Sequence, residues 1–195
     1  MYILQSLASL LLQKEAVKKS IQLRSVSASS INISYNRECL QLIHSGDCYQ
    51  FSFFMTWSLL AELEELASAQ RKSVLYFDCE CSVHIENFVQ KNPESFLTAF
   101  SIDCADCFSK HVFNVVDNSS NVFAVVVDSI TSFNYSDNFE VFLKALDVLL
   151  RFAVEREMVI VVGMCDFFCN RRDEILQVFS NNQLSLKSIK LRGFQ

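Results

Sequence analysis

The chain has 195 residues, of which 51% are apolar and 20% charged, and its formal net charge is −5. This length suits one domain with a sizeable core, and the composition excludes disorder over most of the chain. The chain has only 3 glycines and 1 proline, which excludes collagen-like repeats and Gly-rich loops. Its excess of acidic residues argues against a module that binds DNA strongly by itself.

The N-terminal region differs from the rest of the chain. Residues 1–20 are apolar early and lysine-bearing late, which predicts an amphipathic helix, and the Ser-rich residues 25–30 predict a connector. We therefore divide the chain into an N-terminal helix and connector (1–30) and a core domain (31–195). A membrane span is not expected, because the apolar stretches fall short of the roughly 18 residues that a span needs. A secretory signal is not expected either, because no basic residue precedes the apolar residues 1–12.

The core alternates apolar runs with helical patterns. Four runs that are apolar at consecutive positions predict strands buried on both faces, at residues 74–77, 112–116, 122–127 and 158–162. Apolar residues at three- and four-residue spacing predict helices at 53–70, 139–157 and 171–179. Residues 184–191 alternate, as a half-buried edge strand does. This order predicts a single α/β domain with a doubly wound, mostly parallel sheet flanked by helices.

The 8 cysteines are interpreted as reduced and largely buried thiols, because the chain is neither short nor rich in loops. One alternative is a zinc site of four thiolates from Cys79, Cys81, Cys104 and Cys107, two pairs with chelating spacing. The more ordinary interpretation uses these cysteines as small apolar residues, and no metal site is predicted.

The apolar run 122–127 ends in Asp128, followed by small hydroxyl residues. Ligands bind at the carboxyl ends of the strands in a doubly wound sheet, where an aspartate can hold a magnesium-bound water beside a triphosphate. The alternative is an aspartate that only caps the following turn.

Three stretches in this order carry a family resemblance. Val-Val-Val-Asp-Ser-Ile-Thr, ending at Thr131, resembles the Walker B segment of the RecA-type strand-exchange recombinases and their eukaryotic paralogues. Ser-Val-Leu-Tyr-Phe-Asp-Cys-Glu, ending at Glu80, resembles their second core strand, in which the glutamate activates the attacking water. Residues 158–163 resemble the next strand. The resemblance covers about residues 40–192 and implies a RecA-like core.

The phosphate-binding loop departs from the family pattern. Aligning Ser52 with the hydroxyl position of the Walker A motif puts Ser45 and Gln50 where glycines are needed and Phe51 where the lysine is needed. We therefore interpret Ser45, Gln50, Phe51 and Ser52 as a vestigial Walker A loop, with Asp128 and Glu80 as a vestigial Walker B and glutamate. These two acidic residues are either remnants that now serve as caps and turn residues, or they face a nucleotide held by a neighbouring subunit.

The resemblance implies a non-catalytic recombinase paralogue, of the Shu type or of the small nematode paralogue complex. Such a subunit forms a heterodimer with another paralogue and binds or remodels the recombinase filament on single-stranded DNA in the nucleus. Mg-ATP would be held at an interface by the partner, which would also carry any hydrolysis. The alternatives are an ATPase-dead scaffold subunit of another complex, such as Elongator, and a nucleotide-binding enzyme with a non-standard loop.

One short motif concerns docking. Phe96-Leu-Thr-Ala99 resembles the Phe-x-x-Ala signature with which recombinase protomers and their mediators dock. The chain composition produces about one such spacing by chance. The alternative is therefore a loop anchored by its apolar residues.

Overall fold

A computed structural model describes residues 20–23, 31–34, 38–44, 49–79, 95–133, 137–165 and 171–191. In chain order the elements are β1 (Ser20–Leu23), β2 (Ile31–Ser34), β3 (Glu38–His44), α2 (Tyr49–Ala69), β4 (Ser73–Asp78), β5 (Leu97–Ser101), α4 (Ala105–Asn118), β6 (Val122–Asp128), the 3₁₀ turn η1 (Ile130–Phe133), α5 (Phe139–Glu155), β7 (Val159–Cys165), α6 (Arg172–Asn181) and β8 (Ser185–Leu191).

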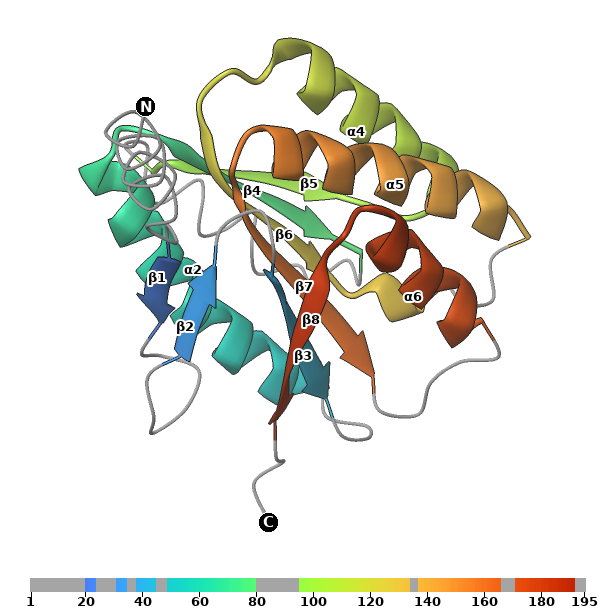
Figure 1. Cartoon of the computed structure of the whole chain (residues 1–195), viewed down its shortest axis with the longest axis horizontal. Helices are drawn as coiled ribbons and strands as arrows, with labels where there is room; N and C mark the ends of the chain where they lie inside the picture. Colours follow the sequence, from blue (N-terminus) through green and yellow to red (C-terminus); the bar gives the residue numbers. More distant parts are fainter. Residues whose placement is uncertain are drawn as a thin grey trace, which may run out of the picture.

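Six of these strands form one sheet in the order β5-β4-β6-β7-β3-β8, and every neighbouring pair is parallel (Figure 1). The remaining two, β1 and β2, form a separate antiparallel pair. Because all six strands point the same way, their carboxyl ends meet at one edge of the sheet. This edge is where an open α/β sheet binds ligands.

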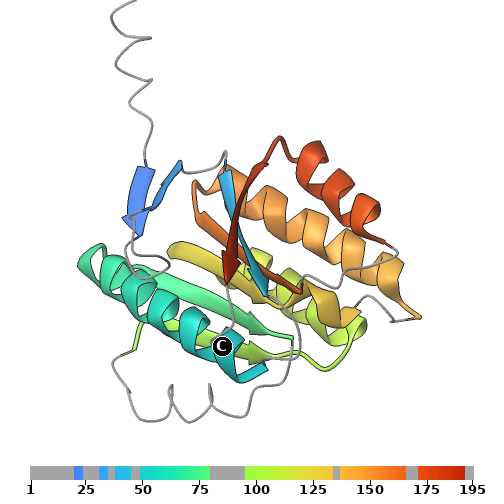
Figure 2. The ribbon, with the colours of Figure 1, turned by 90° about the horizontal axis from the view of Figure 1, so that it is seen from below.

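Helices cover both faces of the sheet. Among the described helices, α2 lies on one face, and α4, α5 and α6 lie on the other (Figures 1 and 2). Each face has its own apolar core. On the α2 side, Leu59 and Leu63 share a buried cluster with Val126, and on the other side Phe108 and Phe142 share one with Val127. The strands between are buried on both faces, which explains why their sequences are continuously apolar.

The predicted fold class is confirmed at the level of layers and topology. The expected strands at 74–77, 122–127 and 158–162 correspond to β4, β6 and β7, and the three expected helices correspond to α2, α5 and α6. The expected edge strand at 184–191 is β8, which lies at one end of the sheet.

The strand predicted at residues 112–116 is wrong, because these residues belong to α4. The buried positions of α4 are Ala105, Phe108, Val112 and Val115, whose spacing of three and four is helical. Phe113, in the middle of the expected strand, is 50% exposed. The apolar run therefore combines one core-facing side of a helix with a residue that faces solvent.

The division at residue 30 stays a prediction. Residues 1–19 and 24–30 lie outside the described part of the chain, and β1 pairs with β2 across the proposed boundary. Within the described residues, no helix combines the length and the apolar character needed to cross a membrane.

Candidate functional site

Two aspartates end neighbouring strands at the carboxyl edge of the sheet. Asp78 is the last residue of β4 and Asp128 the last residue of β6, and the parallel register pairs them directly. Their exposed fractions are only 4% and 7%. Two carboxylates are thus held side by side and largely out of water, an arrangement that is rare unless the groups are hydrogen-bonded or charge-compensated.

Tyr76 supports this pair from within the sheet. Its hydroxyl donates a hydrogen bond of 3.1 Å to Oδ2 of Asp128, and the ring is buried in the core on the α2 side. Burial raises the pKa of Tyr76 well above its ordinary value, and the negative charges of Asp128 and Asp78 raise this pKa further. The phenol therefore stays protonated and remains a hydrogen-bond donor to the carboxylate.

Gly163 of β7 borders the same carboxylate on its other side. Residues Val127 and Val162 are register partners, so Asp128 and Gly163 are the next positions along the two strands. A Cβ on Gly163 would overlap Oδ1 of Asp128 and would lie 3.3 Å from its Cγ. The absence of a side chain at this position therefore makes room for the aspartate.

The turn after β6 is organised by hydroxyl groups. Ser129, which is buried, accepts the backbone N–H of Thr131 on its Oγ and donates a hydrogen bond of 2.7 Å to the Thr131 hydroxyl. Its carbonyl accepts the hydroxyl of Ser132 at 2.8 Å. The peptide bond between Asp128 and Ser129 is cis. One interpretation of the sequence was that Asp128 caps this turn. The side-chain hydrogen bonds given above all involve Ser129.

Three of the residues that were interpreted as a vestigial Walker A loop lie at the start of α2. Gln50, Phe51 and Ser52 are the second to fourth residues of this helix, which begins at the same edge as Asp78 and Asp128 because β3 ends there. The backbone thus places the Walker A-like and Walker B-like segments at one edge. Ser45 and Glu80 lie outside the described residues, so their assigned roles stay predictions.

The donor groups at this edge fit a hard cation better than a nucleotide. Carboxylate oxygens are the ligands that Mg²⁺ prefers, and the edge carries two of them. Phosphates instead need a cradle of backbone N–H groups and a cation. Residues 45–52 contain one glycine and neither lysine nor arginine. Residues 45–52 therefore lack the residue types that hold phosphates, whereas the two carboxylates are of the kind that can ligate a metal ion.

The docking motif is part of a strand and not of a loop. Phe96 directly precedes β5, and Ala99 lies within β5, where it pairs with Tyr76. Both side chains are half-buried. This corrects the expected anchored loop: β5 is an edge strand whose residues Leu97 and Ala99 pack on the α2 side of the sheet.

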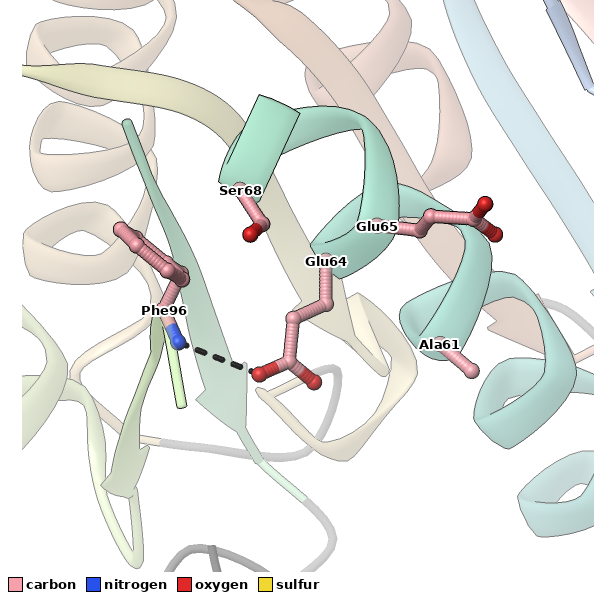
Figure 3. Close-up of a pocket in the computed structure, with 5 residues that line it drawn as sticks. All are labelled: Ala61, Glu64, Glu65, Ser68 and Phe96. Carbon is pink, nitrogen blue, oxygen red and sulfur yellow. Dashed lines mark hydrogen bonds between the residues drawn. The ribbon is translucent and has the colours of Figure 1, made fainter. Parts of the chain in front are cut away.

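Glu64 of α2 fixes the entry into β5. Its Oε1 accepts the backbone N–H of Phe96 at 3.1 Å and the hydroxyl of Ser95 at 2.5 Å. Figure 3 shows Glu64 reaching from the helix toward the Phe96 nitrogen. A depression of about 590 Å³ lies between helix and strand, lined by Ala61, Glu64, Glu65, Ser68 and Phe96. The motif is thus attached to α2, and its role in docking stays a prediction.

The cysteines of the zinc alternative occupy different environments. Cys79 is buried, Cys104 is exposed and Cys107 is half-buried, whereas Cys81 lies outside the described part of the chain. Among the residues that are described, no three histidine, cysteine or acidic side chains are grouped as metal ligands. The described residues therefore offer no support for a zinc site.

Sequence reasoning missed two members of this edge, Tyr76 and Asp78. Asp78 ends an apolar run as Asp128 does, so the same signal could have identified it. No comparable signal exists for Tyr76, because only the strand register brings it beside Asp128. Gly163 ends a stretch that was matched to a strand of the family, but its contact with the carboxylate could not be read from the sequence.

Three comparisons with known proteins bear on this chain. No family model matches it, and no curated protein matches it. Among solved structures, a crystal structure of the RadB recombinase is similar, with a TM-score of 0.55 and 16% sequence identity, over 80% of this chain and 76% of that one. At this identity the likeness concerns the fold. It confirms the predicted RecA-like α/β architecture.

Proposed function

We propose that this chain is a non-catalytic recombinase paralogue that acts in homologous recombination in the nucleus. It forms a heterodimer with a second paralogue, and the pair binds or remodels the recombinase filament on single-stranded DNA. The observation that carries the proposal is the RecA-like fold with Asp128 at the Walker B position, combined with a strand-to-helix connection that lacks phosphate-binding residues.

Charge and backbone chemistry both oppose the binding of a triphosphate by this chain alone. A triphosphate is held by several backbone N–H groups, which need residues that tolerate positive φ, and by a lysine that neutralises the phosphates. In the corresponding segment the lysine position is Phe51, and Asp47 adds a negative charge. Two more carboxylates, Asp78 and Asp128, lie at the same edge. The local field therefore opposes the binding of a polyanion.

A partner can supply what this chain lacks. Asp78 and Asp128 remain as oxygen ligands for a divalent cation, whereas the phosphate-binding groups would come from the second subunit. Mg-ATP would then lie at the interface, and hydrolysis would depend on residues of the partner. The role of this chain is to complete and orient that interface.

Binding of DNA is assigned to the complex. The chain has 22 acidic and 17 basic residues, so its net charge of −5 opposes attraction to phosphate backbones. We expect the isolated chain to bind single-stranded DNA weakly, and the heterodimer to bind it more tightly through phosphate contacts that the partner makes. Strong and salt-sensitive binding by the isolated chain would overturn this assignment.

The first experiment is co-purification of the tagged chain from native extract, with identification of stoichiometric proteins by mass spectrometry. The expected eluate contains a recombinase and an ATP-binding paralogue. Recovery of RecA-like subunits together with transfer-RNA factors would transfer the chain to an Elongator-like scaffold, and the recombination proposal would be abandoned.

The second experiment titrates Mg-ATP into the isolated chain and into the reconstituted heterodimer by calorimetry. The chain alone is expected to give no heat of binding, and the heterodimer is expected to bind. Micromolar binding by the isolated chain would contradict the non-catalytic assignment and favour an enzyme with a non-standard loop. Asp128→Asn in the heterodimer is the matched variant, because it keeps the shape of the side chain and removes its charge.

A further inference from the structure

Two cysteines share the first turn of α4, at the carboxyl edge of the sheet. Cys104 is the N-cap of this helix, in an extended conformation with φ −154° and ψ 166°. Its Sγ accepts the backbone N–H of Cys107 at 3.4 Å. The sulfur of Cys104 therefore contacts the backbone of Cys107, which carries the second thiol.

The two thiols differ in accessibility. Cys104 is exposed and Cys107 is half-buried, with its thiol donating to the carbonyl of Ser101 at 3.8 Å. By contrast, Cys39 and Cys79 are buried. Burial also raises the pKa of Cys39. Among the cysteines whose side chains are described, this pair alone combines proximity with access from solvent.

Asp103 lies against both sulfurs. Its pKa is lowered mainly by a hydrogen bond from the Cys104 thiol, and a bond from the Cys107 thiol contributes as well. The charge of this carboxylate therefore acts on both thiols. In return, the pKa of Cys107 is raised, first by burial and then by the charge of Asp103, which disfavours a thiolate at this position.

We propose that Cys104 and Cys107 form a redox-active dithiol that exchanges with low-molecular-weight disulfides of the glutathione class and closes into an intramolecular disulfide. The exposed Cys104 thiolate attacks one sulfur of the small disulfide, which forms a mixed disulfide and releases one thiolate. Cys107 loses its proton to water, and its thiolate attacks Sγ of Cys104 and releases the second small thiolate. The protein dithiol is oxidised by two electrons, and one disulfide is reduced to two thiols.

The helix start favours both steps. Residues three apart at the start of a helix are neighbours, and a disulfide requires Cβ atoms roughly 3.5–4.5 Å apart. The contact of the Cys104 sulfur with the Cys107 backbone N–H already brings the two residues together. Backbone N–H groups at the first turn stabilise the negative charge on the attacking sulfur. A ring closed within one turn does not require any movement of β5 or of the body of α4.

The test uses the complete protein, equilibrated in mixtures of reduced and oxidised glutathione, blocked with N-ethylmaleimide and digested with trypsin. Residues 92–110 form one tryptic peptide that contains Cys104 and Cys107 and no other cysteine. The expected product lacks two hydrogens and carries no blocking group. A peptide that stays doubly blocked, carries two glutathione adducts or is linked to another cysteine peptide would overturn the proposal.

Two serine variants test the order of attack. Serine is a preferred N-cap residue, so Cys104→Ser keeps the cap of α4 and the fold while it removes the attacking thiol. In this variant the glutathione adduct at Cys107 is expected to form at least about tenfold more slowly than the adduct at Cys104 forms in Cys107→Ser. The reason is that burial and the charge of Asp103 disfavour the Cys107 thiolate. Cys107→Ser is expected to accumulate a stable adduct at Cys104. Equal reactivity of the two variants would overturn the assigned roles.

Asp103→Asn tests whether the charge of Asp103 affects the two thiols. Asp103 is fully exposed, so this substitution leaves the fold intact and removes the charge beside both sulfurs. Ring closure is expected to become about threefold faster at neutral pH, because the loss of this charge lowers the pKa of Cys107 and so raises its thiolate fraction. An unchanged or slower closure would contradict the arrangement of the three groups.

Discussion

The hydroxyl of Tyr76 donates a hydrogen bond to Oδ2 of Asp128 across 3.1 Å, although 52 positions separate the two residues in the sequence. The two strands are direct neighbours in the sheet, and the Tyr76 ring belongs to the core on the α2 side. Asp128 is therefore oriented by a side chain of the neighbouring strand. This buried hydrogen bond fixes Oδ2 of Asp128, and Oδ1 of the same carboxylate faces Gly163 of β7.

Tyr76→Phe removes only the hydroxyl and leaves the ring in the core. The carboxylate of Asp128 then loses a buried donor, so we expect the free energy of unfolding to fall by about 1–3 kcal/mol, measured by urea denaturation. Ser73→Ala is the comparison, because it removes an exposed hydrogen bond to the Asn121 carbonyl and should change stability by less than about 0.5 kcal/mol. Equal effects of the two variants would show that the buried bond is not formed.

Gly163→Ala tests the close approach of β7 to Asp128. The added Cβ overlaps Oδ1 of the carboxylate, so we expect a loss of about 1–3 kcal/mol in urea denaturation. In the background of Asp128→Ala the same substitution meets no carboxylate and should be tolerated better. A double-mutant cycle should therefore give a coupling energy above about 0.5 kcal/mol. Additive effects would contradict the contact.

Alkaline pH should destabilise the fold through Tyr76 and Cys39. Burial raises the pKa of both groups above their ordinary values of 10.0 and 9.0. As pH rises past those values, the unfolded chain loses these protons before the folded chain does. Stability therefore falls with pH, by at most about 1.4 kcal/mol per pH unit for each group.

The measurement is urea denaturation between about pH 8 and 11. Cys39→Ala should reduce the slope above pH 9, and Tyr76→Phe should reduce it above pH 10, whatever their effects at neutral pH. Ser73→Ala should keep the slope of the unchanged protein. An identical slope in all four proteins would mean that neither group is protected from ionisation.

The parts of the fold that were predictable from sequence are those where burial alone decides the structure. The run 122–127 is buried at every position, so its apolar continuity identified β6 directly. Residues 112–116 misled the prediction because Val112 and Val115 face the core while Phe113 faces solvent. β5 escaped notice because an edge strand with Thr98 and Ser101 exposed has no strong apolar signature.

The candidate site was predictable from the sequence only where its signal is local. Asp128 was identified because an apolar run ends in a carboxylate, and this signal is local. The bond from Tyr76 and the contact with Gly163 depend on which strands lie next to each other. Strand order is a property of the whole chain, and no short motif encodes it.

The helical assignment of residues 105–118 can be tested at two adjacent positions. Val112 is fully buried, and Val112→Ala should lower the free energy of unfolding by about 1.5–3 kcal/mol. Phe113 is 50% exposed, and Phe113→Ala should cost less than about 1 kcal/mol despite its larger side chain. The reverse order in urea denaturation would favour a strand with Phe113 in the core.

Glu64 is expected to hold the start of β5 against α2, because its Oε1 accepts bonds from both Ser95 and Phe96. Glu64→Ala should lower the free energy of unfolding by about 1–2 kcal/mol and should speed hydrogen exchange at the Phe96 amide, whose acceptor is lost. Glu65→Ala is the matched control, since this neighbour on the same helix is exposed and its loss should leave both quantities nearly unchanged. If Glu64→Ala changes exchange throughout the sheet and not at the start of β5, the residue supports the whole domain. If both variants behave alike, the Glu64 bonds do not anchor the strand, and the Phe96-to-Ala99 segment is positioned by its packing on the α2 side alone.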